Sequence, residues 1–278
     1  MIKQFDNEIA SSFMLYVDHL IQQKGNAYYG ATGTFFPVSG QYYGKYTYAC
    51  PFKQLVNDSS LTGSTDILSG VYLNGNFITV GQNGLESINH YQGSVTFNTQ
   101  LASSASLTGS FSVKDFNVYM TSEPEDSLIY QSKFFKNPRY SQTFGPISTS
   151  SLTVPAVFIK KRGGDSVPFS FGAVDESIIN FRAIVISDNQ FLNDAACSIL
   201  KDSHMRRFSV ITDLPFDKRG SYTGQAYDYT GLADGVTYRP LIKDVDETRI
   251  TSFKSLEPIS SDLHVSFVDF EVSWVRSH

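Results

Sequence analysis

Apolar residues are densest at Ile178 to Ile186, a strand-like run rich in β-branched residues in which Arg182 is the only charge. Such a run, bounded by polar residues, is typical of a strand that is buried on both faces. The residues that follow, Ser187 to Asn189, offer side-chain oxygens to the free N–H groups of a helix. Helical spacing then predicts a helix over residues 189–202, and we expect strand and helix to form the packing nucleus. The apolar stripe expected on that helix consists of Phe191, Leu192, Ala195, Ala196, Ile199 and Leu200.

A second helical pattern lies near the N-terminus, from Glu8 to Lys24, with Asn7 as its expected N-cap. Gly25 follows as the residue expected to adopt the left-handed stop. The stripe is wide enough for this amphipathic helix to dock on a sheet or on a neighbouring subunit. Its apolar positions are Ile9, Phe13, Tyr16, Val17, Leu20 and Ile21.

Short strands punctuated by glycine follow the first helix. Asn74-Gly75 lies between Val71 to Leu73 and Phe77 to Val80, and Asn-Gly is the strongest short signal for a β-hairpin because both residues tolerate positive φ. From Gly109 to Met120 the apolar residues change parity midway along the run. This change predicts a β-bulge or a strand that passes through two environments.

Aromatic residues are concentrated in residues 27–50, where Tyr42, Tyr46 and Tyr48 share one strand face. Aromatic faces of this kind serve either as base-stacking platforms or as β interfaces. Because few basic residues lie nearby, we interpret the segment as a β interface.

Two adjacent segments suggest how the chain divides. The acidic residues around Pro124, from Glu123 to Asp126, predict a surface loop, and their oxygens lack the spacing of a calcium loop. Leu128 to Phe135 is then expected to form a strand. Residues 137–153 are rich in Pro, Gly, Ser and Thr, which is typical of a connector. We therefore place a first lobe at residues 1–136 and a second at residues 154–278.

The second lobe opens with a predicted strand, Pro155 to Ile159, followed by a hydrophilic turn, Lys160 to Asp165. A long polar loop with several tyrosines, Asp213 to Arg239, is expected to touch a partner or to order on assembly. At the end of the chain, Val265 to Trp274 changes parity once, which predicts a bulged strand with one apolar and one wet face. The sheet is expected to tie down the terminus.

The fold class that these patterns predict is mainly β, of the α+β kind. We expect two β-rich lobes, built as sandwiches or barrels, with the amphipathic helix at the N-terminus and one helix in the second half. A length of 278 residues with 41% hydrophobic residues suffices for two cores. Charged residues make up only 18%, whereas Phe and Tyr number 22 and 16, a balance that favours a subunit of an assembly.

The formal net charge of -5 argues against a protein that binds nucleic acid by neutralising phosphates. The basic clusters, Lys160 to Arg162 and Arg206-Arg207, do not extend into a stripe, so we interpret both as solvated. Cys50 and Cys197 are too few for a disulfide framework or a four-thiolate zinc site. No run is long enough to cross a membrane, and the opening residues lack the pattern of a secretory signal. We expect the chain to stay in the cytoplasm of the cell that makes it, unless it leaves inside a particle.

Candidate chemistry is sparse. The five histidines show no metal-ligand spacing, and the sequence Asp202-Ser203-His204 stands at a predicted helix end, where capping accounts for all three residues. Asp244 and Asp246 are the pair that we would test first for hydrolysis, since paired carboxylates cleave glycosides. A charged surface strand is the simpler interpretation. We predict no catalytic, cofactor-binding or metal-binding residues.

Three stretches resemble structural proteins of tailed bacteriophages, of the long-tailed marine kind. They are VYLNGNFITVGQNGLESINHYQGSVTF at 71–97, GSFSVKDFNVYMTSEPEDSLIYQSKF at 109–134, and the region from Val154 to Asp202. The resemblance implies a non-enzymatic virion protein, in a ring at the neck or tail that joins head and tail components. It implies a hexamer or dodecamer, neighbours among the neck, portal-adaptor or tail proteins, and assembly in the host cytoplasm. It supplies no catalytic residues and implies no cofactor.

Two alternatives stay open. The first is a baseplate or receptor-binding protein that engages host-surface glycan through exposed tyrosines and acidic loops. The second is a glycan-cleaving β-fold enzyme that uses Asp244 and Asp246.

Overall fold

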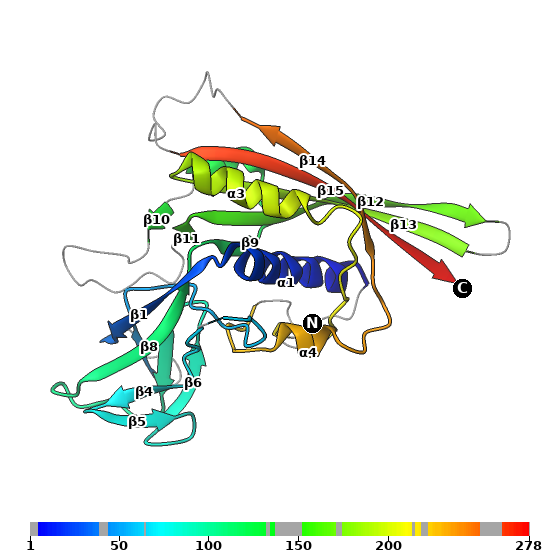
Figure 1. Ribbon diagram of the computed structural model, residues 1–278. Helices are drawn as coiled ribbons and strands as arrows, with labels where there is room; N and C mark the ends of the chain where they lie inside the picture. The colour runs from blue at the N-terminus through cyan, green and yellow to red at the C-terminus, as the bar shows by residue number, and fades with distance from the viewer. Residues whose placement is uncertain are drawn as a thin grey trace.

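The chain is mainly β with several helices, as expected, and it consists of a sandwich of two small sheets, a longer sheet and the helices that pack on it (Figure 1). The computed structural model describes residues 5–38, 44–63, 65–131, 134–136, 152–170, 174–212, 215–217, 222–250 and 263–277.

The longer sheet, called the long sheet below, has the strand order β14-β15-β13-β12-β9. Among its first four strands each strand is antiparallel to its neighbours. Strand β9 runs parallel to β12 and pairs with it only along Ala156 to Ile159. The strands of the long sheet are β9 (Asn117–Met120), β12 (Ala156–Ser170), β13 (Val174–Ser187), β14 (Leu241–Arg249) and β15 (His264–Ser277).

The central strand β13 is buried on both faces from Ala183 to Ile186, whereas Asn180 is exposed on the face opposite α1, so the interpretation of the run from Ile178 to Ile186 is confirmed in its second half. Phe181 and Val185 belong to the larger core, on the face that the helices cover. Ile184 and Ile186 belong to a separate cluster on the opposite face. The strand therefore shares its side chains between two cores, which explains its continuous apolar pattern.

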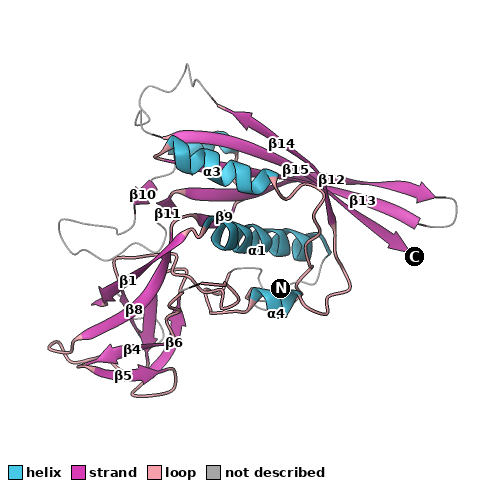
Figure 2. Cartoon of the chain, viewed as in Figure 1, coloured by secondary structure: helices cyan, strands magenta, loops and turns pink. Residues whose placement is uncertain are grey.

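Helix α1 (Phe5–Gly25) lies between the long sheet and the sandwich (Figure 2). Phe13 is fully buried, stacks on Phe181 of β13 with ring centroids 4.6 Å apart, and meets Phe270 of β15 edge-on at 5.0 Å. The predicted helix is confirmed, and it docks on a sheet of its own chain. Its predicted ends are wrong, because the helix begins at Phe5, ahead of the expected N-cap Asn7, and the left-handed residue at its end is Asn26, with φ 45°, in place of Gly25. Because it is covered on more than one side, α1 also buries residues outside the predicted stripe, such as Leu15.

A buried ion pair joins α1 to the sandwich. Lys114, at the end of strand β8 (Leu107–Lys114), places Nζ 2.7 Å from Oδ2 of Asp18 on α1, and the two side chains are only 3% and 2% exposed. Tyr227 donates its hydroxyl to the same carboxylate oxygen at 3.3 Å. Two charges removed from water in this way require each other, since either one alone would be buried without a counter-charge.

The sandwich consists of two four-stranded sheets, ordered β1-β8-β4-β5 and β2-β3-β7-β6. One core of side chains from both sheets, including the fully buried Phe97 and Phe111, holds them together. Its strands are β1 (Tyr28–Thr34), β2 (Phe36–Pro37), β3 (Tyr46–Ala49), β4 (Gly70–Leu73), β5 (Asn76–Thr79), β6 (Leu85–Asn89), β7 (Ser94–Phe97) and β8 (Leu107–Lys114).

The predicted hairpin agrees with the structure, because β4–β5 turns at Asn74 and Gly75, which have φ values of 52° and 83°. Tyr46 and Tyr48 on β3 pack on the core of the sandwich, as their shared face predicts. Tyr42 lies outside the described residues, and the β interface stays a prediction.

The parity change between Gly109 and Met120 marks a change of sheet. Strand β8 ends at Lys114 in the sandwich, and β9 begins at Asn117 in the long sheet. The predicted passage through two environments is thus correct, and two separate strands accomplish it in place of a bulge.

Helix α3 (Gln190–Lys201) confirms the prediction for residues 189–202, with Asn189 as N-cap and Asp202 as C-cap. The predicted stripe is partly wrong, because Phe191 is 85% exposed and Leu192 and Ala195 also face solvent. The helix turns the buried Asn193 toward the sheet, where its Nδ2 donates to two backbone carbonyls at 3.2 Å. The face that this contact selects consists of Asn193, Ala196, Cys197 and Leu200.

The strand predicted from Leu128 to Phe135 is wrong over most of its length. Residues Glu125–Gln131 form helix α2, and a short strand, β10 (Phe134–Lys136), follows. Two carboxylates in the first turn suit the positive end of the helix dipole. The predicted acidic surface loop therefore begins a helix.

The expected connector falls largely outside the described residues, although β10 pairs in parallel with β11 (Leu152–Val154). The division at residues 137–153 stays a prediction. Residues of the predicted first lobe pack against the predicted second lobe, because α1 and β9 precede the connector and contribute to the core of the long sheet.

Two predictions in the second half are corrected. The expected turn at Lys160 to Asp165 is part of the continuous strand β12, with an irregularity between Lys161 and Gly163. This stretch tolerates its charges because it lies at the margin of the sheet. The bulge expected in the last strand lies in its neighbour β14, between Ile242 and Asp244, while β15 pairs with β13 without a register shift.

The long loop from Asp213 to Arg239 contains the short helix α4 (Tyr229–Ala233). Tyr227 and Tyr229 are buried in the core that contains α1. These two tyrosines of the loop therefore pack inside their own chain, and contact of the loop with a partner stays a prediction.

We expect Phe13→Ala to lower the free energy of unfolding by about 3–5 kcal/mol, because it empties the centre of an aromatic cluster. Phe191→Ala removes the same atoms from an exposed site and is expected to change stability by less than about 0.5 kcal/mol. Urea denaturation followed by circular dichroism measures both. Equal losses in the two variants would contradict the central position of α1.

Candidate functional site

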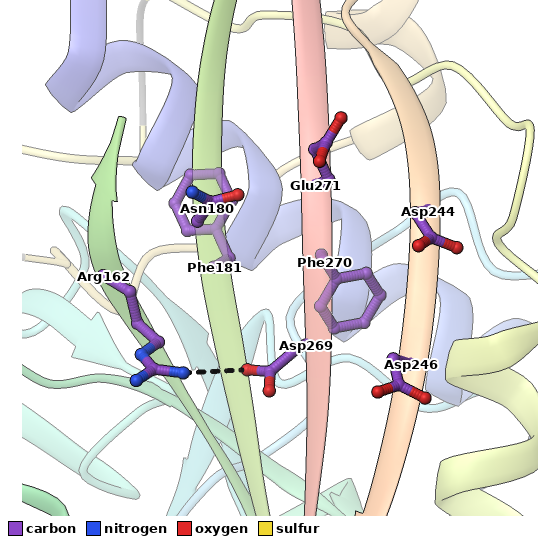
Figure 3. A pocket seen from close by; sticks show the side chains of 8 residues that line it. All are labelled: Arg162, Asn180, Phe181, Asp244, Asp246, Asp269, Phe270 and Glu271. Carbon is purple, nitrogen blue, oxygen red and sulfur yellow. Dashed lines mark ion pairs between the residues drawn. The ribbon is translucent and has the colours of Figure 1, made fainter. Parts of the chain in front are cut away.

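Four carboxylates gather on the face of the long sheet opposite α1 (Figure 3). Asp244 and Asp246 project from β14, and the register places them opposite Glu271 and Asp269 of β15. We call these four residues the acidic face. They border a hollow of about 400 Å³, with Arg162, Asn180, Phe181 and Phe270 as its other lining residues.

Two arginines hold Asp269. Arg182 donates to both of its carboxylate oxygens, at 2.7 and 2.6 Å, and Arg162 lies 3.7 Å away. Arg182 also donates to Glu125 at 2.9 Å and lies over the ring of Phe267. Hydrogen bonding to Asp269 is the main cause that raises the pKa of Arg182. Asp269 is therefore engaged as a bidentate ion-pair acceptor.

The charges on this side of the sheet are sorted from one margin to the other. In one row across the strands, Lys160 on β12 and Arg182 on β13 are followed by Asp269 on β15 and Asp246 on β14. In the adjacent row, Glu271 and Asp244 again occupy the β15 and β14 end. In the first row the cations thus stand on the β12 side and the anions on the β14 side, while Lys243 on β14 adds a cation 3.5 Å from Glu271.

The geometry of the acidic face suits ion pairing better than hydrolysis. A glycosidase needs one protonated and one ionised carboxyl group on either side of a bound sugar. Here Asp269 is tied to arginine, Glu271 lies 3.5 Å from Lys243, and Asp244 accepts the N–H of Val245 at 2.9 Å. Among the described residues, no group of His, Cys, Asp and Glu side chains has the geometry to hold a metal ion.

A Ser-His-Asp combination occurs beside α1, at His19, Asp58 and Ser60. His19 Nδ1 lies 2.7 Å from Oδ2 of Asp58, and its ring stacks on Tyr229 with centroids 4.4 Å apart. The hydroxyl of Ser60 donates to the same carboxylate at 2.7 Å. In a catalytic triad the serine bonds to the imidazole, so this arrangement is that of a structural network.

Hydrogen bonds stabilise the ionised form of Asp58. Burial by itself would raise the pKa of this carboxyl group, but hydrogen bonds from His19, from Ser60 and from the N–H of Tyr229 outweigh it, and the pKa is lowered. The carboxylate links α1, the loop after β3 and the start of α4.

The sequence Asp202-Ser203-His204 caps a helix end. Asp202 is the C-cap of α3 and pairs with Lys24 at 3.3 Å, and the Ser203 hydroxyl donates to the carbonyl of Leu200. His204 points into solvent. The structure does not bring the three side chains together as a catalytic set.

Both cysteines are buried and free of disulfides. Burial raises the pKa of the Cys197 thiol to about 11, so almost none of it is thiolate at neutral pH. Cys197 is a small residue of the larger core.

A second hollow, of about 550 Å³, lies beyond the start of β14, and we call it the margin groove. Met205 and Arg207 stand on one side of it, and Trp274 and Val275 of β15 on another. Met205 and Val275 expose much of their apolar surface. The groove combines apolar and cationic side chains, as protein interfaces do.

The sequence pointed to Asp244 and Asp246 but missed Asp269 and Glu271, which complete the acidic face. Charged and apolar residues alternate along β15, and this pattern predicts a strand with one solvent-exposed face. What the sequence lacks is the register that sets β14 beside β15.

The chain matches no model of a known protein family, and a comparison with curated proteins found no similar chain. The resemblance to phage structural proteins stays a prediction. In the part of the chain that the structure describes, no helix has the length and apolar character needed to cross a membrane.

We expect Asp58→Asn to destabilise the protein at pH 7 and to lose this effect in acid. The folded pKa of Asp58 lies below its unfolded value of about 3.9, so its contribution is full above that pH and disappears as the pH falls through the folded pKa. Urea denaturation of both proteins between pH 7 and pH 3 measures the difference. Asp234→Asn, at an exposed site, is the control. A loss of unfolding free energy in Asp58→Asn that is the same at pH 3 as at pH 7 would contradict the lowered pKa of Asp58.

Thiol reactivity tests the burial of the cysteines. We expect a disulfide reagent such as DTNB to modify neither cysteine in the native protein and both after unfolding, because burial hides both thiols and also raises the pKa of Cys197. The variant Ser198→Cys adds an exposed thiol to α3 and should react at once. Rapid modification of a native thiol without that substitution would contradict the inert role.

Proposed function

We propose that this chain is a non-enzymatic structural protein of a tailed phage particle, which forms a ring at the neck or tail and joins head and tail components. The observation that carries the proposal is the sorting of charge across the long sheet. Cations at Lys160 and Arg162 mark one margin, and anions at Asp244 and Asp246 mark the other.

Two different complementary surfaces on one chain are what a ring requires. A heterologous contact joins one patch of each copy to another patch of the next, and such contacts close into a ring when the rotation per copy divides the circle. A two-fold dimer, by contrast, needs one surface that complements itself. The opposed margins of the long sheet therefore support a head-to-tail assembly, for which we propose a hexamer or dodecamer.

Neighbouring proteins in the particle would use other surfaces. Exposed aromatic side chains outside the strands of the long sheet include Phe191 on α3 and Tyr72 and Phe77 on the β4–β5 hairpin. Aromatic residues are enriched where protein surfaces meet. We propose them as contacts to neck, portal-adaptor or tail proteins in a virion that assembles in the host cytoplasm.

A second candidate function is glycan binding by a baseplate or receptor-binding protein. The hairpin pair Tyr72 and Phe77, with ring centroids 5.2 Å apart and exposures of 42% and 49%, favours it. Sugar rings pack on exposed aromatic faces in many binding sites. A glycan array separates the two functions, because only this candidate predicts binding that Tyr72→Ala removes.

Light scattering after size exclusion tests the proposed ring. We expect a mass of six or twelve times 30.9 kDa, because heterologous contacts close at a fixed number of copies. Mass spectrometry of particles of the phage that carries this gene should find six or twelve copies of the chain for each ring of portal protein. A chain absent from purified particles defeats the proposal.

A further inference from the structure

We infer that the outer edge of β12 in one copy of this chain pairs with β14 of the next copy, so that successive long sheets join into one antiparallel ring. The inference rests on the proposed function and adds the surface through which the ring closes. Four features carry it. Both edges are open, the strand directions agree, the charges are complementary, and residues Asp165 and Val167 of β12 meet the margin groove.

Both edges are open within the described residues, β12 over eleven residues and β14 over seven. Strand β9 covers β12 only along Ala156 to Ile159, so β12 from Lys160 to Ser170 pairs with β13 alone. On the other margin, residues 205–207 pair with the start of β14, through hydrogen bonds to Ile242. From Lys243 to Arg249, β14 pairs only with β15. Open edges present rows of N–H and C=O groups that template a further strand.

The directions of the strands fit a ring. Within one chain β14, β15, β13 and β12 alternate, so β12 and β14 run in opposite directions. Rotation about a ring axis keeps each copy in the same orientation along that axis. The β14 strand of one copy therefore meets β12 of its neighbour antiparallel, which continues the pattern of the sheet.

Complementary charges select this pairing over the alternatives. Lys160 and Asp246 stand at the ends of one cross-strand row, on the face that also carries Asp244. When copies join head to tail, the cations of β12 stand across from the anions of β14, and opposite charges across strands stabilise a sheet. Pairing of β12 with β12, or of β14 with β14, would oppose like charges, so two-fold dimers through these edges are disfavoured.

The register that sets Lys160 beside Asp246 also brings the later residues of β12 to the margin groove. In this register Lys160 to Gly163 lie opposite Asp246 to Lys243 of the neighbour, and β12 leaves the edge of β14 beyond them, because residues 205–207 already pair with β14 at Ile242. The exposed residues Asp165 and Val167 of β12 arrive at the margin groove, where Met205 and Arg207 provide apolar and cationic partners. The groove thus extends the same contact beyond the paired strands.

Charged edges can also serve to prevent sheet-to-sheet aggregation. Protective charges act by repulsion between copies of the same edge, and reversing the sign of one edge leaves that repulsion in place, so the chain should be monomeric before and after the reversal. Charges that form a contact act by attraction, so the wild type should assemble and reversal of one edge should abolish association. The two roles therefore predict different results for the wild type and for a mixture of the two reversed chains.

Two charge-reversed chains test the inference. In Lys160→Glu/Arg162→Glu both edges are acidic, and in Asp244→Lys/Asp246→Lys both are basic. We expect each variant alone to run as a 30.9 kDa monomer in light scattering, whereas the wild type forms the ring. An equimolar mixture should assemble again, with the two chains alternating and an even number of copies by native mass spectrometry. A single chain with all four substitutions should also regain the ring.

The control Glu123→Lys/Asp126→Lys reverses two charges away from both edges and should leave the ring intact. Circular dichroism and the melting temperature establish that every variant is folded. Reversed variants that assemble as the wild type does overturn the edge pairing and leave the proposed function standing. A wild-type chain that stays monomeric at every concentration also overturns it, while the particle analysis decides the function separately.

Discussion

The structure depends on the burial of α1 between the long sheet and the sandwich. Phe13 stacks on Phe181 and meets Phe270 in the core of the sheet. Five residues later, Asp18 forms the buried ion pair with Lys114 of the sandwich. One helix thus holds an aromatic contact on one side and an ionic contact on another. A helix committed on both sides leaves the sheet's opposite face and its margins as the surfaces available for other partners.

That arrangement determines where charge can stand on the long sheet. The α1 side is apolar, so β13 and β15 place Arg182, Asp269 and Glu271 on the opposite face, beside Asp244 and Asp246 of β14. Arg182 and Asp269 pair in the middle of the face, and unlike charges remain toward the two margins. A sheet whose two margins carry opposite charges can join a second copy head to tail. A two-fold dimer would instead need one margin that complements itself.

Local signals in the sequence predicted local features well. The second half of the run from Ile178 to Ile186, the cap at Asn189 and the turn at Asn74-Gly75 depend on neighbouring residues, and all three agree with the structure. Features that depend on distant partners were missed. Lys160 to Asp165 is strand because β13 pairs with it, and Asp269 joins Asp246 because β14 and β15 share a register. Neither pairing leaves a local signal.

The central claim is that the sheets of adjacent copies are continuous, and electron cryo-microscopy of the wild-type assembly tests it most directly. The account predicts a closed ring in which β14 of each copy lies one strand spacing, about 4.8 Å, from β12 of the next. A ring whose copies meet through the sandwich or through α3, with both sheet edges exposed to solvent, would contradict it.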